Sequence, residues 1–171
     1  MKGGRLRNRD RYLEEAMLFR DTDLIKVITG VRRCGKSSLL DLIRMAVESE
    51  GVAGRGFVSV NLESKGTGIK TEDQLYDYVR GRLSDKGRTY VFIDEPQRID
   101  GWQDAVNAMR IDFDCDIYLT GSNAYLLSSE LATYLSGRYV EVKMLPLSFS
   151  EFADFCGIEF VSGTSVALTP E

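Results

Sequence analysis

The sequence predicts an α/β fold in which a mostly parallel sheet of five strands carries helices on both faces. Two observations predict this class. Short apolar stretches of strand length alternate along the chain with amphipathic stretches of helical period, a pattern typical of βαβ units. A loop bracketed by two glycines also joins the first apolar stretch directly to a helical one. With 171 residues, 43% of them hydrophobic, the chain has about the length of one domain.

The first half of the chain predicts two helices, two strands and a long loop. Residues 9–20 have apolar side chains on one helical face, and the apolar stretch 24–28 predicts the first strand. A helix over 37–49 follows, with its apolar residues at three- and four-residue spacing, and glycines end it. Residues 57–62 alternate as a strand does, and 64–70 form a loop with no periodicity.

The second half continues the alternation of helices and strands. Thr71 to Gln74 match a capping box, which begins a helix that reaches Leu83. Residues 89–93 are a nearly continuous apolar run, which is typical of a strand buried on both faces. The remaining elements are a helix over 102–110, a strand over 116–120, a helix over 124–135, a strand over 138–145 and a helix capped at Ser148 that runs to Phe155.

The glycine-bracketed loop fits the pattern G-x-x-x-x-G-K-[ST], with Gly30, Gly35, Lys36 and Ser37 on the fixed positions. Glycines allow successive N–H groups to line an anion nest, and the following helix turns its positive end toward the same point. Lys36 supplies a mobile charge for the β- and γ-phosphates of a nucleotide, and the Ser37 hydroxyl is a ligand for Mg²⁺. The expected nucleotide-binding residues are Gly30, Val31, Arg32, Arg33, Cys34, Gly35, Lys36, Ser37 and Ser38, with Ser122 from a later strand end.

Polar residues at the ends of two later strands predict the rest of the site. Because the carboxyl ends of parallel strands meet at one edge of a sheet, these residues should lie near the phosphate loop. Asp94 is expected to hold Mg²⁺, directly or through water, and Glu95 to act as general base toward the attacking water. Asn123 or Ser122 would position that water. The alternatives are helix capping for one carboxylate and ordinary turn chemistry for Gly-Ser-Asn.

Several other side chains have two readings that the sequence leaves open. Arg138 begins the fifth strand and is a candidate catalytic arginine, in cis or from a neighbouring subunit; otherwise it pairs with Glu141 or is a surface charge. Arg32 and Arg33 either add positive field at the phosphates or face a partner. Tyr12 either contacts the base or packs in the core, and packing is favoured. Oxidation or alkylation of Cys34 would block nucleotide binding.

Composition excludes several classes of function. The chain has no histidine, which excludes Ser–His hydrolysis and His-ligated zinc. Its three cysteines form no C-x-x-C pair, which suggests reduced thiols in the cytoplasm. No apolar run approaches the roughly 18 residues of a membrane span, so no membrane segment is expected. Residues 1–20 carry six basic side chains against three acidic ones, so this arm is either a weak nucleic-acid contact or a solvated segment.

These motifs together resemble a family of AAA+-like P-loop ATPases of bacteria and archaea that carry a C-terminal domain of unknown function. The resemblance covers about residues 9–156. It implies ATP as the nucleotide, the strand order 5-1-4-3-2, and a C-terminal region that this sequence does not include. The expected organisation is a basic arm with a short helix over 1–20, an ATPase domain over 21–156 and a connection cut short over 157–171. The matching segments are residues 28–37, 92–95, 119–123, 135–139 and 146–152.

The leading hypothesis is therefore Mg²⁺-dependent ATP binding and hydrolysis, coupled to conformational change in a larger protein. A nucleotide-gated binding or signalling module with little intrinsic hydrolysis is the alternative, because it would use the same pocket. A P-loop kinase is disfavoured, since no arginine-rich lid segment follows the phosphate loop. The expected ligands are ATP or ADP with Mg²⁺, and Arg138 is the residue through which a homo-oligomer would complete the site.

Overall fold

The computed structural model describes residues 9–52, 56–121, 135 and 137–158, and the backbone of 160–161 and 165–166. Its centre is a five-stranded sheet in the order β2-β3-β4-β1-β5, and all four neighbouring pairs are parallel. Read from the other edge this is 5-1-4-3-2, so both the fold class and the topology are confirmed. The strands are β1 (Ile25–Gly30), β2 (Phe57–Asn61), β3 (Thr89–Asp94), β4 (Cys115–Gly121) and β5 (Tyr139–Met144).

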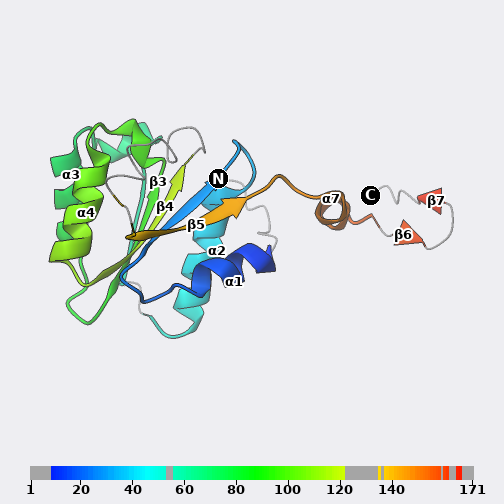
Figure 1. Ribbon diagram of the computed structural model, residues 1–171, viewed down its shortest axis with the longest axis horizontal. Helices are drawn as coiled ribbons and strands as arrows, with labels where there is room; N and C mark the ends of the chain where they lie inside the picture. The colour runs from blue at the N-terminus through cyan, green and yellow to red at the C-terminus, as the bar shows by residue number, and fades with distance from the viewer. Residues whose placement is uncertain are drawn as a thin grey trace.

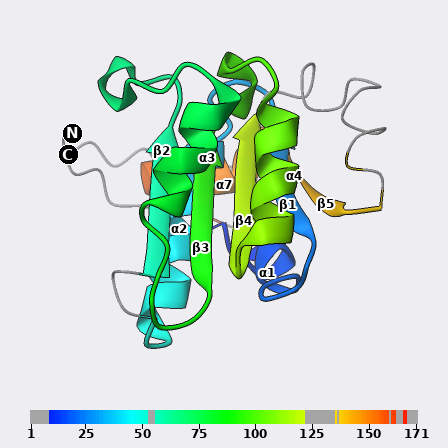
Figure 2. The same cartoon turned by 90° about the vertical axis from the view of Figure 1, so that its left-hand side faces the viewer.

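Helices cover both faces of the sheet, with α1 and α2 on one face and α3 and α4 on the other (Figure 1). Figure 2 shows α3 and α4 side by side over their face. Along β3, Val91 and Ile93 join the core under α3 and α4, whereas Tyr90 and Phe92 join the core under α1 and α2. A strand buried on both faces has no polar alternation, which explains the continuous apolar run in the sequence.

Most helix positions agree with the sequence, and the ends differ by a few residues. The first helix ends at Met17 instead of residue 20, and α3 ends at Arg80 instead of Leu83. The helix expected over 124–135 lies almost wholly outside the described residues. None of the described helices is long and apolar enough to cross a bilayer. The helices are α1 (Asp10–Met17), α2 (Lys36–Ser49), α3 (Glu72–Arg80), α4 (Trp102–Asp112) and α7 (Phe149–Cys156), with short 3-10 turns at η2 (Lys65–Thr67) and η3 (Pro96–Arg98).

The two expected helix caps differ in how completely they form. At α7, the Ser148 hydroxyl accepts from the Glu151 N–H and the Glu151 carboxylate accepts from the Ser148 N–H, which is a full capping box. At α3, the Thr71 hydroxyl accepts from the Gln74 N–H, but the Gln74 side chain accepts from Lys70. Beyond α7, β6 (Phe160–Val161) and β7 (Ser165–Val166) form an antiparallel pair that the sequence did not predict.

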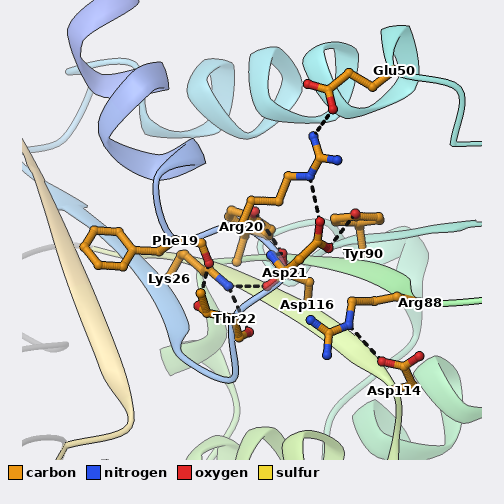
Figure 3. A network of polar contacts seen from close by, with 11 residues as sticks. Phe19, Arg20, Asp21, Thr22, Lys26, Glu50, Arg88, Tyr90, Asp114 and Asp116 are labelled. Carbon is orange, nitrogen blue, oxygen red and sulfur yellow. Dashed lines mark hydrogen bonds and ion pairs between the residues drawn. The ribbon is translucent and has the colours of Figure 1, made fainter.

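A buried polar network lies at the amino edge of the sheet, near the starts of β1 and β4 (Figure 3). Lys26 and Asp116 form an ion pair in which both side chains are 0% exposed. Asp116 also accepts from the Asp21 N–H at 2.9 Å and from the Tyr118 hydroxyl at 3.1 Å. Burial lowers the pKa of Lys26, and the Asp116 carboxylate opposes that shift. The network extends through Asp21 to Tyr90, whose hydroxyl donates to the Asp21 carboxylate at 2.7 Å.

Candidate functional site

The loop predicted to bind phosphate lies between β1 and α2, the strand and the helix that were expected around it. Gly35, the residue before α2, has a φ of 97°, in the left-handed region that glycine favours. A Cβ at Gly30 would lie 2.6 Å from the Cys34 Sγ and 2.6 Å from the Met144 carbonyl oxygen, so only glycine fits there. Among the described residues, no side chain caps the start of α2. The N–H groups of its first turn can therefore bind an anion.

Lys36 lies across this loop and is 6% exposed. Its Nζ donates to the carbonyl oxygens of Gly30 at 3.1 Å and Val31 at 3.2 Å. These contacts hold the ammonium over the loop, beside the first turn of α2. A phosphate group entering the loop would meet this ammonium together with the helix N-terminus, and both favour negative charge.

Asp94 ends β3 at the carboxyl edge of the sheet and is 6% exposed. Its Oδ2 accepts from the Ser37 hydroxyl and from the Asn61 amide, each at 2.9 Å, and its Oδ1 accepts from the Thr120 hydroxyl. Residues from α2, β2 and β4 thus converge on one carboxylate. Carboxylate and hydroxyl oxygens are the ligands that Mg²⁺ prefers, so Ser37 and Asp94 fit the metal role expected of them.

Glu95 follows Asp94 with a φ of 59°, a left-handed conformation that is rare outside glycine. Its N–H donates to the Thr120 carbonyl oxygen at 3.2 Å, which helps to fix this backbone geometry. Its carboxylate accepts a hydrogen bond from the Gln97 side chain. Such backbone strain is characteristic of functional sites, where surrounding structure maintains it. Glu95 is partly exposed and faces the cleft described next.

A cleft of about 790 Å³ opens beside the phosphate loop. Its volume lies within the range of small-molecule sites, roughly 300 to 1,000 Å³. Four cationic side chains and two carboxylates line it, so its field favours a polyanion. Arg98 and Glu63 also pair with each other at 3.1 Å. The lining residues are Arg32, Arg33, Gly35, Lys36, Ser37, Ser38, Glu63, Glu95, Gln97 and Arg98.

Five residues of this edge were not among the predicted site residues. Asn61 and Thr120 hold Asp94, and Glu63, Gln97 and Arg98 line the cleft. Asn61 and Thr120 could have been found, because each stands at the carboxyl end of a predicted strand, the position that already singled out Asp94. The cleft-lining residues follow strand ends within loops, where sequence alone does not indicate which side chains turn inward.

Arg138 lies at the opposite edge of the sheet from the phosphate loop. Its carbonyl oxygen accepts from the N–H of Ile25, the first residue of β1, and its guanidinium donates to the Asn107 side chain at 3.3 Å. The structure therefore does not bring Arg138 to the site of its own chain, because a residue that precedes a parallel strand lies at the amino edge. The pair with Glu141, one of the two alternatives to a catalytic role, does not form among the described residues, where the Glu141 carboxylate accepts from the Thr29 hydroxyl. A role in a neighbouring subunit's site stays a prediction.

The other predicted residues have varied positions. The Cys34 side chain is buried beside Gly30 and does not line the cleft. Tyr12 is buried in the core and its hydroxyl accepts from the Leu145 N–H at 3.2 Å, in agreement with the packing alternative. Ser122 and Asn123 lie outside the described residues.

Comparison with known proteins gives relatives over most of the chain. It is 47% identical over 147 residues to an uncharacterized protein of Haemophilus influenzae, covering 85% of this chain and 37% of that protein. It is 36% identical over 132 residues to an uncharacterized protein of Methanocaldococcus jannaschii, covering 77% of this chain and 28% of the relative. The chain thus spans about a third of the length of these curated relatives.

Comparison with solved structures supports the same fold. A DNA polymerase III gamma subunit-related protein of Thermotoga maritima matches with a TM-score of 0.58 at 15% identity, covering 85% of this chain and 48% of that one. The family model of the AAA domain matches residues 22–153, which include the phosphate loop, Asp94 and Glu95. On its sequence, and with the sheet order and phosphate loop described above, the chain belongs to the AAA domain family.

Proposed function

We propose that this chain binds ATP with Mg²⁺ and hydrolyses it, as the AAA-type domain of a larger protein. The observation that carries the proposal is the 2.9 Å contact between the Ser37 hydroxyl and the Asp94 carboxylate, beside the uncapped start of α2. Two oxygen atoms of the kind that bind Mg²⁺ thus lie beside the first turn of α2, and the Lys36 ammonium lies over the same loop. Membership of the AAA domain family supports nucleotide binding at this site.

Each side chain has a distinct role in the proposed reaction. The first-turn N–H groups of α2 and the Lys36 ammonium hold the phosphates. Ser37 and Asp94 would hold Mg²⁺, which neutralises charge on the β- and γ-phosphates when bound. Glu95 accepts a proton from water as the water oxygen attacks the γ-phosphorus; the bond from this phosphorus to the β,γ-bridging oxygen breaks, and ADP and inorganic phosphate leave. Asn123 or Ser122 would orient that water.

Further roles concern groups outside this chain. Arg138 of a neighbouring subunit is a candidate for stabilising the charge that develops on the transferring phosphoryl group. Contact of the basic arm over 1–20 with nucleic acid stays a weaker proposal. The boundaries at residues 21 and 156 also stay predictions.

The alternative is a nucleotide-gated binding module with little hydrolysis, and one observation favours it. The Glu95 carboxylate is engaged by the Gln97 side chain. This hydrogen bond holds the carboxylate in one direction, so the carboxylate is not free to turn toward an attacking water. Nucleotide binding would then change the conformation of the cleft without rapid turnover. Both readings require the same binding residues, so they differ only in the rate of the chemical step.

The test measures MgATP binding and phosphate release for the unaltered chain, Lys36→Ala and Glu95→Gln. The controls are Lys86→Ala and Glu14→Gln, which change exposed residues of the same types away from the cleft. Lys36→Ala should abolish binding, and Glu95→Gln should keep binding and stop hydrolysis. Tight binding by the unaltered chain without turnover would indicate either the binding module or an ATPase that needs the rest of the larger protein, and the same assay on a longer chain would distinguish them. No binding of ATP or ADP by the unaltered chain would refute both proposals.

A further inference from the structure

Arg9 makes contacts that join the start of α1 to the back of the phosphate loop. Its side chain is only 7% exposed. Its Nη1 donates to the Cys34 carbonyl oxygen at 3.2 Å and to the Leu145 carbonyl oxygen at 2.9 Å. Cys34 belongs to the phosphate loop, and Leu145 directly follows β5. A single guanidinium nitrogen, Nη1, thus links the phosphate loop to the segment that follows β5.

We propose that Arg9 is a positioning residue that aims the Gly35 N–H into the phosphate site. This inference rests on the proposed nucleotide binding at the same loop. The peptide between Cys34 and Gly35 is trans and planar, so its carbonyl and its N–H point in opposite directions. Arg9 donates to the carbonyl and is not one of the residues that line the cleft, whereas Gly35 lines it. The N–H of Gly35 is thereby directed toward the bound anion.

The charge and position of Arg9 are themselves fixed by partners. The Glu151 carboxylate accepts from its Nε at 2.8 Å and from its Nη2 at 3.2 Å, a bidentate pair. The guanidinium also lies 4.5 Å from the centroid of the Tyr12 ring. The hydrogen bond from Arg9 to the Glu151 carboxylate is the main reason that the pKa of Glu151 lies below its ordinary value. Because Glu151 balances its charge, Arg9 orients the Cys34–Gly35 peptide and does not itself bind the phosphates.

The contact to Cys34 is what distinguishes positioning from simple support of the fold. Bonds to Glu151 and Leu145 alone would attach α1 to α7 and β5. The bond to Cys34 does not attach α1 to either of these elements. It fixes the Cys34–Gly35 peptide in the phosphate loop, whose backbone conformation determines where the Gly35 N–H points. Loss of Arg9 should therefore reduce phosphate affinity beyond its effect on folding.

The test compares Arg9→Met and Arg9→Lys with Arg88→Met, at a temperature where every variant is folded. Arg88 is the matched control, because its Nε pairs with Asp114 at the same 2.8 Å but at the opposite edge of the sheet. Calorimetry measures affinity for MgADP and MgATP, and NMR follows the Gly35 amide. Arg9→Met should lower the affinity for both nucleotides equally, by about tenfold, as expected for the loss of one charge-assisted hydrogen bond. Arg88→Met should leave affinity unchanged.

Arg9→Lys keeps the charge beside Glu151 but lacks the fork that reaches two carbonyls, so about threefold weaker binding is expected. A shift of the Gly35 amide in this variant supports the inference even if Arg9→Met does not fold, and an unshifted amide overturns it. Unaltered nucleotide affinity in Arg9→Met overturns the inference and leaves the proposed function standing. If the unaltered chain binds neither nucleotide, both proposals fail.

Discussion

Replacement of Asp116 by asparagine tests how far the stability of this fold depends on the buried pair at the amino edge of the sheet. Asp116 receives three donors: the Lys26 ammonium, the Asp21 N–H and the Tyr118 hydroxyl. An asparagine of the same shape keeps one acceptor oxygen and loses the charge. Lys26 is then left without a charged partner at 0% exposure, and it keeps a 3.4 Å contact to the Thr22 carbonyl oxygen and the Tyr118 ring, whose centroid lies 5.4 Å from Nζ.

The cost follows from that burial. Removing one partner of a buried ion pair typically destabilises a protein by about 3 to 5 kcal/mol, because the remaining charge is uncompensated. For a chain of this length each kcal/mol lowers the melting temperature by about 2 to 4 °C, so a fall of about 6 to 20 °C is expected. Lys26→Met should cost less, since Asp116 would keep two donors. Arg88→Gln breaks the more exposed pair with Asp114 and should cost under about 1 kcal/mol.

Urea unfolding followed by circular dichroism measures these differences, and nucleotide affinity is measured beside it. Affinity should stay the same in all three variants, because the pair lies at the edge of the sheet opposite the phosphate loop. If Asp116→Asn costs no more than Arg88→Gln, the ion pair is not a main support of the fold. If Lys26→Met costs more than Asp116→Asn, the loss of stability does not depend on how many hydrogen-bond partners the remaining buried residue keeps.

Two further predictions concern the carboxyl edge. Gln97→Ala removes the hydrogen bond to Glu95, so kcat for ATP should rise by about fivefold, the equivalent of about 1 kcal/mol, with KM unchanged; a lower kcat in steady-state assays would mean that Gln97 helps to orient the water. The pKa of Glu151 is lowered in the folded state by its arginine partner, so its contribution to stability is present above its ordinary pKa, near 4.3, and is lost as pH falls through the lower folded value. Glu151→Gln should therefore reduce the difference in urea midpoint between pH 6 and pH 3, and an unchanged difference would contradict this assignment.

The sequence predicted those parts of the site that local chemistry determines. The phosphate loop needs only a strand, two glycines, a lysine and a hydroxyl in order, and these are neighbours along the chain. Asp94 and Glu95 were predicted because they end an apolar strand. Asn61 and Thr120 also stand at strand ends, but their contact with Asp94 depends on strand register: Asn61 pairs with Asp94 across β2 and β3, and Thr120 pairs with Asp94 across β3 and β4. Register results from the packing of the whole sheet, which no local pattern encodes.

Sheet topology also explains why Arg138 does not reach the phosphate loop of its own chain, where the sequence analysis had placed it as one option. It was chosen for its chemistry, although it precedes a strand, and in a parallel sheet that position lies away from the ligand edge. The sequence analysis did not identify Lys26 and Asp116 as a buried pair, because their pairing depends on which strands are neighbours. Each is a charged residue near the start of an apolar strand, and their pairing is visible only once β1 and β4 are neighbours.

The two edges of the sheet illustrate how one parallel arrangement separates stability from binding. At the amino edge, Asp116 and Lys26 satisfy each other and are closed off from water. At the carboxyl edge, Lys36 donates to loop carbonyls and the first turn of α2 has no capping side chain, so these donors can be transferred to a ligand at little cost. Asp94 keeps contacts on both oxygens and therefore stays in place while its neighbours exchange partners. A fixed carboxylate among exchangeable donors is the arrangement that preorganised phosphate chemistry requires.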